Sequence, residues 1–292
     1  MTLSLDQTWL DPQTSWNAKL ERAREHLHAL RMQVNEYRAS EPYAVKPEST
    51  DVPERLAYRL HIWRPQPIMI STTVGDILHN LRASLESVAF ELARRSHGGM
   101  LTPAQEGKST FPIKKIPADF EDFFRQRKDL YSDHARSSFH AFQPFVELER
   151  AHAHGVATGK EIGSDSEWHL LYRLDKLWNI DKRRRLIPGV WWPEMFWWGS
   201  NGESKRRMSR GDGTSEHGSI LFYIEGADAG MGDIVMHEFN LVLRDDPAFA
   251  LAKDVTQDVV ELMEQFTNHV DSIIRQIAWG ITSTSGNDGT RV

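Results

Sequence analysis

Two long stretches near the ends of the chain carry apolar residues at steps of three and four, and this pattern constrains the fold most strongly. In the first stretch, from Ser15 to Arg38, charged residues separate the apolar positions. In the second, from Pro247 to Trp279, valine, methionine, phenylalanine and isoleucine repeat at the same steps. Such steps place apolar side chains on one face of an α-helix. Each stretch is therefore predicted to be a long amphipathic helix, and we expect the two to pack together in a bundle.

Segments typical of β-strands lie between these helices. The segment "RLAYRLHIW" alternates apolar and polar residues, and "LIPGVWWPEMFWW", "SILFYIEG" and "DIVMHEFNLVLRDD" are predicted as further strands. The proline-containing "SEPYAVKPESTDVPE" and the polar "GSNGESKRRMSRGDGTSEHG" are predicted as loops. We expect an α+β fold, mainly a helical bundle with a small, mostly antiparallel β-sheet packed on it.

Shorter helical patterns complete the predicted architecture. They cover Gly75–Arg95, ending at Gly98 and Gly99, then 118–126, 133–142 and 166–185. The prediction is a single domain over 1–282, with β-sheet insertions near 53–73 and 186–245. Residues 283–292, rich in serine, threonine and glycine, are predicted to be a disordered tail.

Composition excludes several classes of function. The chain of 292 residues has no cysteine, which rules out disulfides, thiolate metal sites and cysteine nucleophiles. No apolar run approaches the roughly 20 residues that a membrane span needs, so we expect a cytoplasmic protein without a membrane partner. A net charge of -6 argues against broad, sequence-independent binding of nucleic acid, although a local basic patch can still bind a nucleotide. No glycine-rich phosphate loop occurs, and we expect no cofactor.

The stretch "GDILHNLRASLES", which begins at Gly75, gathers several reactive side chains on one predicted helix. At helical spacing His79, Arg82 and Glu86 share a ridge opposite a wide apolar face, and Arg82 and Glu86 can form an ion pair. Phe90 lies beside this ridge, and we expect the ridge to be covered by another part of the chain. The ridge fits either a structural helix whose polar groups anchor loops or a site with His79, Arg82 and Glu86 as catalytic groups. Asp76 suits the helix amino terminus.

The same stretch carries a resemblance to a known group of proteins. The blocks "GDILHNLRASLESVAFEL", "FPI", "FHAFQPF" and "HLLYRLDKLWNIDKRRRL" are similar, in order and spacing, to a group of uncharacterised bacterial proteins. That group has a "GDxLHNLRSALDHLxxxL" helix, a Phe-Pro-Ile segment, a Gln-Pro-Phe/Tyr turn and a "LxxLxxxDKHRxL" helix. The resemblance covers roughly residues 55 to 187 and implies that both blocks belong to one structural unit.

The arginine and histidine of "RSALDH" look like the RNase signature of HEPN (higher eukaryotes and prokaryotes nucleotide-binding) domains, which are helical bundles. The resemblance implies a HEPN-like architecture that binds a nucleotide or RNA, with a possible homodimer as partner. In this chain Arg82 matches, but Ser87 stands where the group has histidine, and Arg183 replaces the histidine of "DKHR". The nuclease motif is therefore degenerate.

Further ligand-binding candidates lie on both blocks. Cations at the end of the second block can contact phosphate, although cations at a helix carboxyl terminus also complement the helix dipole. Asp175 and Asp181 can supply partners for Arg82. Beside the catalytic candidates, the predicted ligand-binding residues are Asp76, Asn80, His169, Arg173, Arg183 and Arg184.

Two other functions remain open for the same residues. One is a non-catalytic dimerisation or interaction module that uses the long helices and the tryptophan-rich strand "VWWPEMFWWG". The other is a small-molecule enzyme with His79, Arg82 and Glu86 in its pocket. His152, His154, Glu161, Asp165 and His169 form the densest group of metal-ligating residue types, but their spacing fits no standard motif. We therefore predict no metal site.

Overall fold

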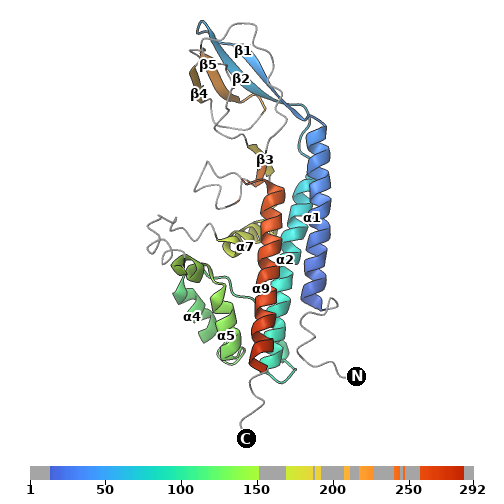
Figure 1. Cartoon of the computed structure of the whole chain (residues 1–292), viewed down its shortest axis with the longest axis vertical. Helices are drawn as coiled ribbons and strands as arrows, with labels where there is room; N and C mark the ends of the chain where they lie inside the picture. The colour runs from blue at the N-terminus through green and yellow to red at the C-terminus, as the bar shows by residue number, and fades with distance from the viewer. Residues whose placement is uncertain are drawn as a thin grey trace.

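Long helices form the body of the molecule. The structure is a computed structural model that describes residues 14–150, 169–186, 188–191, 207–210, 217–225, 240–243, 246 and 257–285. Helices α1 (Ser15–Ala39), α2 (Ile68–Ser96) and α9 (Val259–Ser285) lie side by side (Figure 1), and α7 (Leu170–Asp181) packs on α2 and α9. The predicted packing of the first and last helices is confirmed.

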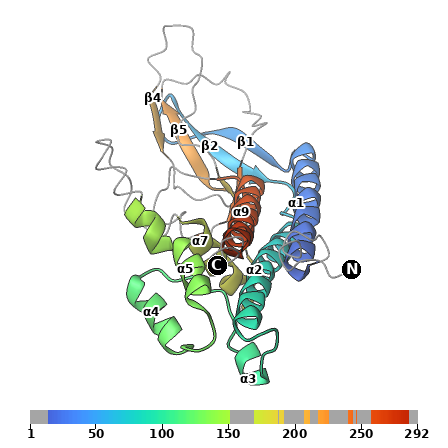
Figure 2. The ribbon, with the colours of Figure 1, turned by 60° about the horizontal axis from the view of Figure 1, so that its bottom comes forward.

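An antiparallel sheet of four strands lies at one end of the bundle, as both views show (Figures 1 and 2). Its order is β1-β2-β5-β4, and a separate pair, β3 with β6, is also antiparallel. The strands are β1 (Tyr43–Ser49), β2 (Arg55–Ile62), β3 (Pro188–Trp191), β4 (Arg207–Arg210), β5 (Ile220–Glu225) and β6 (Asn240–Leu243). The α+β fold with a small antiparallel sheet is confirmed.

Two strands lie where the sequence predicts loops. Strand β1 contains Pro47, which argues against a central strand, but β1 is at the edge of the sheet, where a residue without an N–H is tolerated. Strand β4 has almost no apolar residue and forms the opposite edge, where it pairs with β5 alone. Edge position therefore explains both errors.

Helix α2 begins at Ile68, earlier than predicted, so the predicted β insertion over 53–73 is wrong for its last residues. The stretch "IMISTTV" is rich in β-branched residues, which favour strands. Because Ile70 and Val74 are fully buried in the core, their packing outweighs this local preference. The predicted end is confirmed, since Gly98 and Gly99 have positive φ values and donate backbone hydrogen bonds to Arg95 and Arg94.

The remaining helices differ from prediction mostly at their ends. Helices α4 (Pro117–Arg125) and α5 (Asp133–Ala141) match their predicted ranges closely. A short α3 (Pro103–Glu106) was not predicted, although Thr102 and Gln105 form a capping box there. Helix α7 is shorter than 166–185, and α9 continues through 283–285, which corrects the start of the predicted tail. The first part of the predicted closing helix, 247–256, and the rest of the predicted tail, 286–292, lie outside the described residues.

A cluster of aromatic rings joins α4 and α5 to the segment before them. Phe111 contacts Phe139 edge to face with ring centroids 5.1 Å apart, and Phe124 and Tyr131 contact the same Phe139 ring. Phe111 is 1% exposed, so this cluster fixes the backbone of the "FPI" segment. The segment is thereby held beside α2, where the predicted site residues lie.

Candidate functional site

The two sequence blocks of the resemblance meet where α2 packs on α7. Gly75 lies directly against Asp181: a Cβ atom at position 75 would lie 2.7 Å from both carboxylate oxygens of Asp181. Real Cβ atoms do not approach other atoms so closely, so a larger residue at position 75 would force the Asp181 side chain to move. Gly75 of the first block and Asp181 of the second block are therefore in direct contact.

Arg82 and Glu86 form a clamp on the backbone of Phe111. Arg82 Nη2 lies 2.7 Å from Glu86 Oε1 and donates a hydrogen bond of 3.0 Å to the Phe111 carbonyl. Glu86 Oε2 accepts a 3.0 Å hydrogen bond from the Phe111 N–H. The predicted ion pair is confirmed, and it ties the "FPI" segment to α2.

Arg82 is 7% exposed and retains unused hydrogen-bonding capacity. Its Nε and Nη1 atoms are buried and have no hydrogen-bond partner within the described residues. Asp175 Oδ1 lies 3.6 Å from Nε, too far for a hydrogen bond, and the guanidinium lies 5.2 Å from the centroid of the Trp178 ring. Asp175 is thus a neighbour of Arg82 as predicted, whereas Asp181 faces Gly75 instead.

A cavity of about 470 Å³ opens beside this clamp. Arg82 of α2 and Asp175 of α7 line it together with residues 110–114 around the "FPI" segment, α4 and the two residues after α4. The charged residues of the lining are Arg82, Lys114, Asp119, Asp122, Arg127 and Asp175. Small-molecule sites have volumes of about 300–1,000 Å³, so the cavity has the size of a ligand site.

Two carboxyl groups of this region have perturbed pKa values. Burial raises the pKa of Glu86, and the neighbouring Arg82 charge opposes that rise. Burial also raises the pKa of Asp181, and the negative charge of Asp76 adds to the effect, while His79 opposes it. Perturbed carboxyl groups are features of functional sites and of structural networks alike, and neither Glu86 nor Asp181 lines the cavity.

The other predicted residues of α2 lie on its outer surface. Asp76 and His79 are exposed, and the Asn80 side chain donates to the Asp76 carbonyl within the helix. His79 acts electrostatically on Asp181 and does not line the Arg82 cavity. The ridge is covered at Arg82 and Glu86, as predicted, but His79 is exposed and Phe90 is 37% exposed, so the prediction is wrong for these two residues.

Of the predicted ligand-binding residues on α7, Arg173 already has a partner. Its guanidinium is buried and makes a two-pronged contact with Asp246, with Nη2 to Oδ2 at 2.6 Å. Arg183 and Arg184 are exposed just beyond the last turn of α7. The structure therefore brings together Arg82 and Glu86 but not the basic end of the second block.

Ser87, where the resemblance group has histidine, faces α1. Lys19 Nζ donates a 2.6 Å hydrogen bond to Ser87 Oγ, and Ser15 Oγ donates to the same atom. Arg82 instead faces Phe111 and α7. Arg82 and Ser87 therefore face different neighbours.

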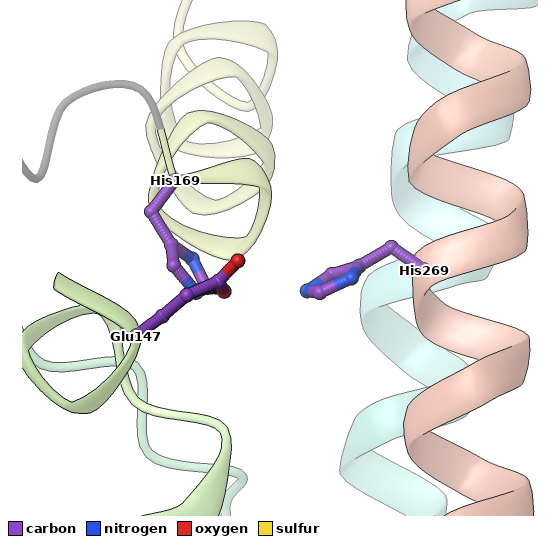
Figure 3. A group of neighbouring side chains, drawn as sticks. All are labelled: Glu147, His169 and His269. Carbon is purple, nitrogen blue, oxygen red and sulfur yellow. Dashed lines mark ion pairs between the residues drawn. The ribbon is translucent and has the colours of Figure 1, made fainter. Parts of the chain in front are cut away.

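A second group of reactive side chains lies on the other side of α7. Glu147, in the helical turns 144–150, lies with His169 and His269 such that one ligand atom from each residue is within 4.8 Å of the others. His169 precedes α7 and His269 projects from α9 toward it (Figure 3). His169 Nε2 lies 2.5 Å from Glu147 Oε2. Burial lowers the pKa of His269 to about 4, and the pKa of Glu147 is lowered chiefly by its contact with His169.

Sequence patterns indicated only part of these two groups. His269 lies three residues after Phe266 and four before Ile273, on the apolar seam of α9, and a histidine at such a position is a detectable signal. Glu147 and the cavity residues Lys114 and Arg127 carry no local signal, because tertiary packing alone brings them into place. His152, His154, Glu161 and Asp165 lie outside the described residues, as does most of "LIPGVWWPEMFWW".

Comparisons add no relative to this description. No protein-family model, curated protein or solved structure matches the chain. None of the helices in the described ranges combines the length and the apolar character of a membrane span.

Proposed function

We propose that the chain binds a nucleoside monophosphate in the cavity beside Arg82. The supporting observation is that Arg82, a buried arginine of the cavity wall, has two nitrogens without a hydrogen-bond partner within the described residues. A buried donor without an acceptor costs about 1–3 kcal/mol. A phosphate oxygen brought to Arg82 would recover that cost and form a charge-assisted hydrogen bond.

The charges of the cavity wall favour a mononucleotide over RNA or a polyphosphate. Lys114 and Arg127 add positive charge to that of Arg82, but Asp119, Asp122 and Asp175 line the same cavity. The three cations and three carboxylates of the lining already offset one another, so a ligand with a single phosphate of about two negative charges adds less repulsion than a polyphosphate. The carboxylates would repel additional phosphates, while they can accept hydrogen bonds from ribose hydroxyl or base amino groups.

Aromatic rings support the same ligand class. Phe123 lines the cavity, and the Arg127 guanidinium lies 4.0 Å from the centroid of its ring. A planar base can stack on an aromatic ring or on a guanidinium plane. Nucleotide binding also agrees with the HEPN-like resemblance, in which binding rather than cleavage would be retained because Ser87 replaces the histidine.

Isothermal titration of the untagged full chain with nucleoside monophosphates tests this proposal. We expect Lys114→Met and Arg127→Met each to weaken binding about 10- to 100-fold, the equivalent of one lost charge-assisted hydrogen bond. Arg275→Met, at an exposed cation on α9, is the matched control and should bind normally. Absence of binding by adenosine, guanosine, cytidine and uridine monophosphate would contradict the proposal. Equal binding of RNA with a steep salt dependence would favour an RNA ligand instead.

A homodimer in the cytoplasm is the second proposal, and exposed apolar residues support it. Trp63, Ile68 and Met69, around the junction of β2 and α2, are each more than half exposed. Clustered exposed apolar side chains are typical of protein interaction sites. Sedimentation equilibrium tests this proposal, because Ile68→Ser with Met69→Ser should convert a dimer to a monomer. A wild-type chain that sediments as a monomer at high micromolar concentration would exclude the dimer.

A further inference from the structure

We propose that Glu147, His169 and His269 bind a divalent cation of the zinc class. Two imidazole nitrogens and one carboxylate oxygen are a ligand set that zinc uses in proteins, with a fourth position left to water. The three side chains come from separate segments, the turns 144–150, the start of α7 and α9, and converge on one point (Figure 3).

The spacing of the ligand atoms is close to what a tetrahedral ion needs. Zinc bonds of about 2.0–2.1 Å place neighbouring ligand atoms about 3.3 Å apart. In this structure His169 Nε2 and Glu147 Oε2 are 2.5 Å apart, and all three ligand atoms lie within 4.8 Å of one another. Shifts of about 1–1.5 Å in the pair distances would therefore form the site.

The hydrogen bonding of the two histidines points to a missing ligand. The Nε2 atoms of both His169 and His269 are buried and have no hydrogen-bond partner within the described residues. His169 Nε2 lies 2.5 Å from Glu147 Oε2, and this contact chiefly lowers the pKa of Glu147, so His269 Nε2 is the nitrogen of this group that lacks a neighbouring acceptor or donor in the described part of the chain. Buried ring nitrogens normally have partners. One metal ion would be the partner of His269 Nε2 and would also be bound by the His169–Glu147 pair.

Ion binding requires one small change in His169. Its Nδ1 accepts a 3.2 Å hydrogen bond from the Leu171 N–H at the start of α7, so the ring proton belongs on Nε2. Coordination through Nε2 moves that proton to Nδ1, which then no longer accepts from the Leu171 N–H, so the cap bond is lost. Loss of such a cap weakens ion binding by about fivefold. This penalty is small beside the affinity of three protein ligands for zinc.

The ligand types also select the ion. Magnesium and calcium prefer oxygen ligands, whereas imidazole favours zinc and neighbouring transition metals. Glu147 has a side chain that is 61% exposed, so the ion would have a path from solvent. His169, at 5% side-chain exposure, would form the inner part of the site.

Titration of the chelator-treated, untagged full chain with zinc chloride tests the site. We expect one zinc ion per chain, and about 100-fold or greater weakening in His269→Phe and in Glu147→Gln, since even an outer partner of a metal ligand is worth 10- to 100-fold. His269→Phe keeps an aromatic ring in the bundle but removes the ligand nitrogens. The control His28→Ala, at an exposed position of α1, should bind zinc normally. Magnesium chloride should give no heat.

A second control separates this site from the histidines of the preceding segment. His152→Ala with His154→Ala should leave zinc affinity within about twofold, because neither residue belongs to the proposed ligand set. Loss of binding in this double variant alone would overturn the proposal. So would wild-type affinity in a His269→Phe variant whose circular dichroism shows the native helix content, or failure of the wild-type chain to bind zinc at micromolar concentrations.

Discussion

Replacement of Arg82 by methionine should destabilise the protein by an amount that depends on pH. Methionine keeps most of the apolar stem but leaves the Phe111 carbonyl without its donor and Glu86 without its cation. The unpaired carbonyl costs about 1–2 kcal/mol. The unpaired carboxylate adds about 1–2 kcal/mol, less than for a fully buried charge because the Glu86 side chain is 29% exposed. We expect a total loss of about 2–4 kcal/mol at pH 7.

The pH dependence follows from the pKa of Glu86. Burial already raises this pKa above the unfolded value, and Arg82 opposes the rise, so the variant should have a still higher pKa. A carboxyl group with a raised folded pKa favours the folded state below the unfolded pKa, and the folded state loses that advantage as pH rises through the folded pKa. The difference in stability between Arg82→Met and wild type should therefore be smallest near pH 4 and grow toward pH 7.

Urea denaturation at a series of pH values measures this difference directly. In the double variant with Arg82→Met and Glu86→Gln, the neutral amide can still accept from the Phe111 N–H, so the double variant should be more stable at pH 7 than Arg82→Met alone. A loss of stability independent of pH, or a double variant less stable than either single one, would refute the clamp.

Three further predictions concern the Gly75–Asp181 contact, the Arg173–Asp246 ion pair and the titration of His269. Gly75→Ala should destabilise by about 1–2 kcal/mol despite the better helix propensity of alanine, and the loss should disappear when Asp181 is also alanine, as thermal unfolding of the four chains would show. Arg173→Met should cost about 3–5 kcal/mol by leaving Asp246 buried without its cation, and urea denaturation should show partial recovery when Asp246→Asn is added. Without metal, the folded chain should lose stability as pH falls from about 6.5 toward 4, because the pKa of His269 is lowered in the folded state and the unfolded chain takes up the proton first. His269→Phe should reduce the slope of unfolding free energy against pH by at most about 1.4 kcal/mol per pH unit.

The apolar periodicity predicted the long helices well because the residues that repeat at helical spacing are the ones that the bundle buries. The steps of three and four in α1 and α9 identify the positions that are buried in the bundle. The start of α2 could not be predicted, since the β-branched residues around Ile70 favour a strand locally and become helical through tertiary packing. Strand β4 could not be predicted either, because an edge strand of mostly polar residues shows no alternation of apolar and polar positions.

The candidate site was predictable only where its residues share a helix. Arg82 and Glu86 are four positions apart, and their pairing follows from that spacing. Their common partner, the Phe111 backbone, is distant in sequence, and no spacing indicates it. Glu147 and His269 likewise meet His169 through the packing of separate segments. Proximity in the sequence therefore indicated a different group, His152, His154, Glu161 and Asp165 with His169.

A crystal structure of the chain grown with a nucleoside monophosphate tests the proposed function most directly. We predict phosphate density in the cavity, with one phosphate oxygen within hydrogen-bond distance of Arg82 and another near Lys114 or Arg127. The base should lie against the Arg127 guanidinium, which covers the Phe123 ring. A nucleotide bound away from this cavity, or a cavity that holds only solvent at saturating nucleotide, would contradict the proposal.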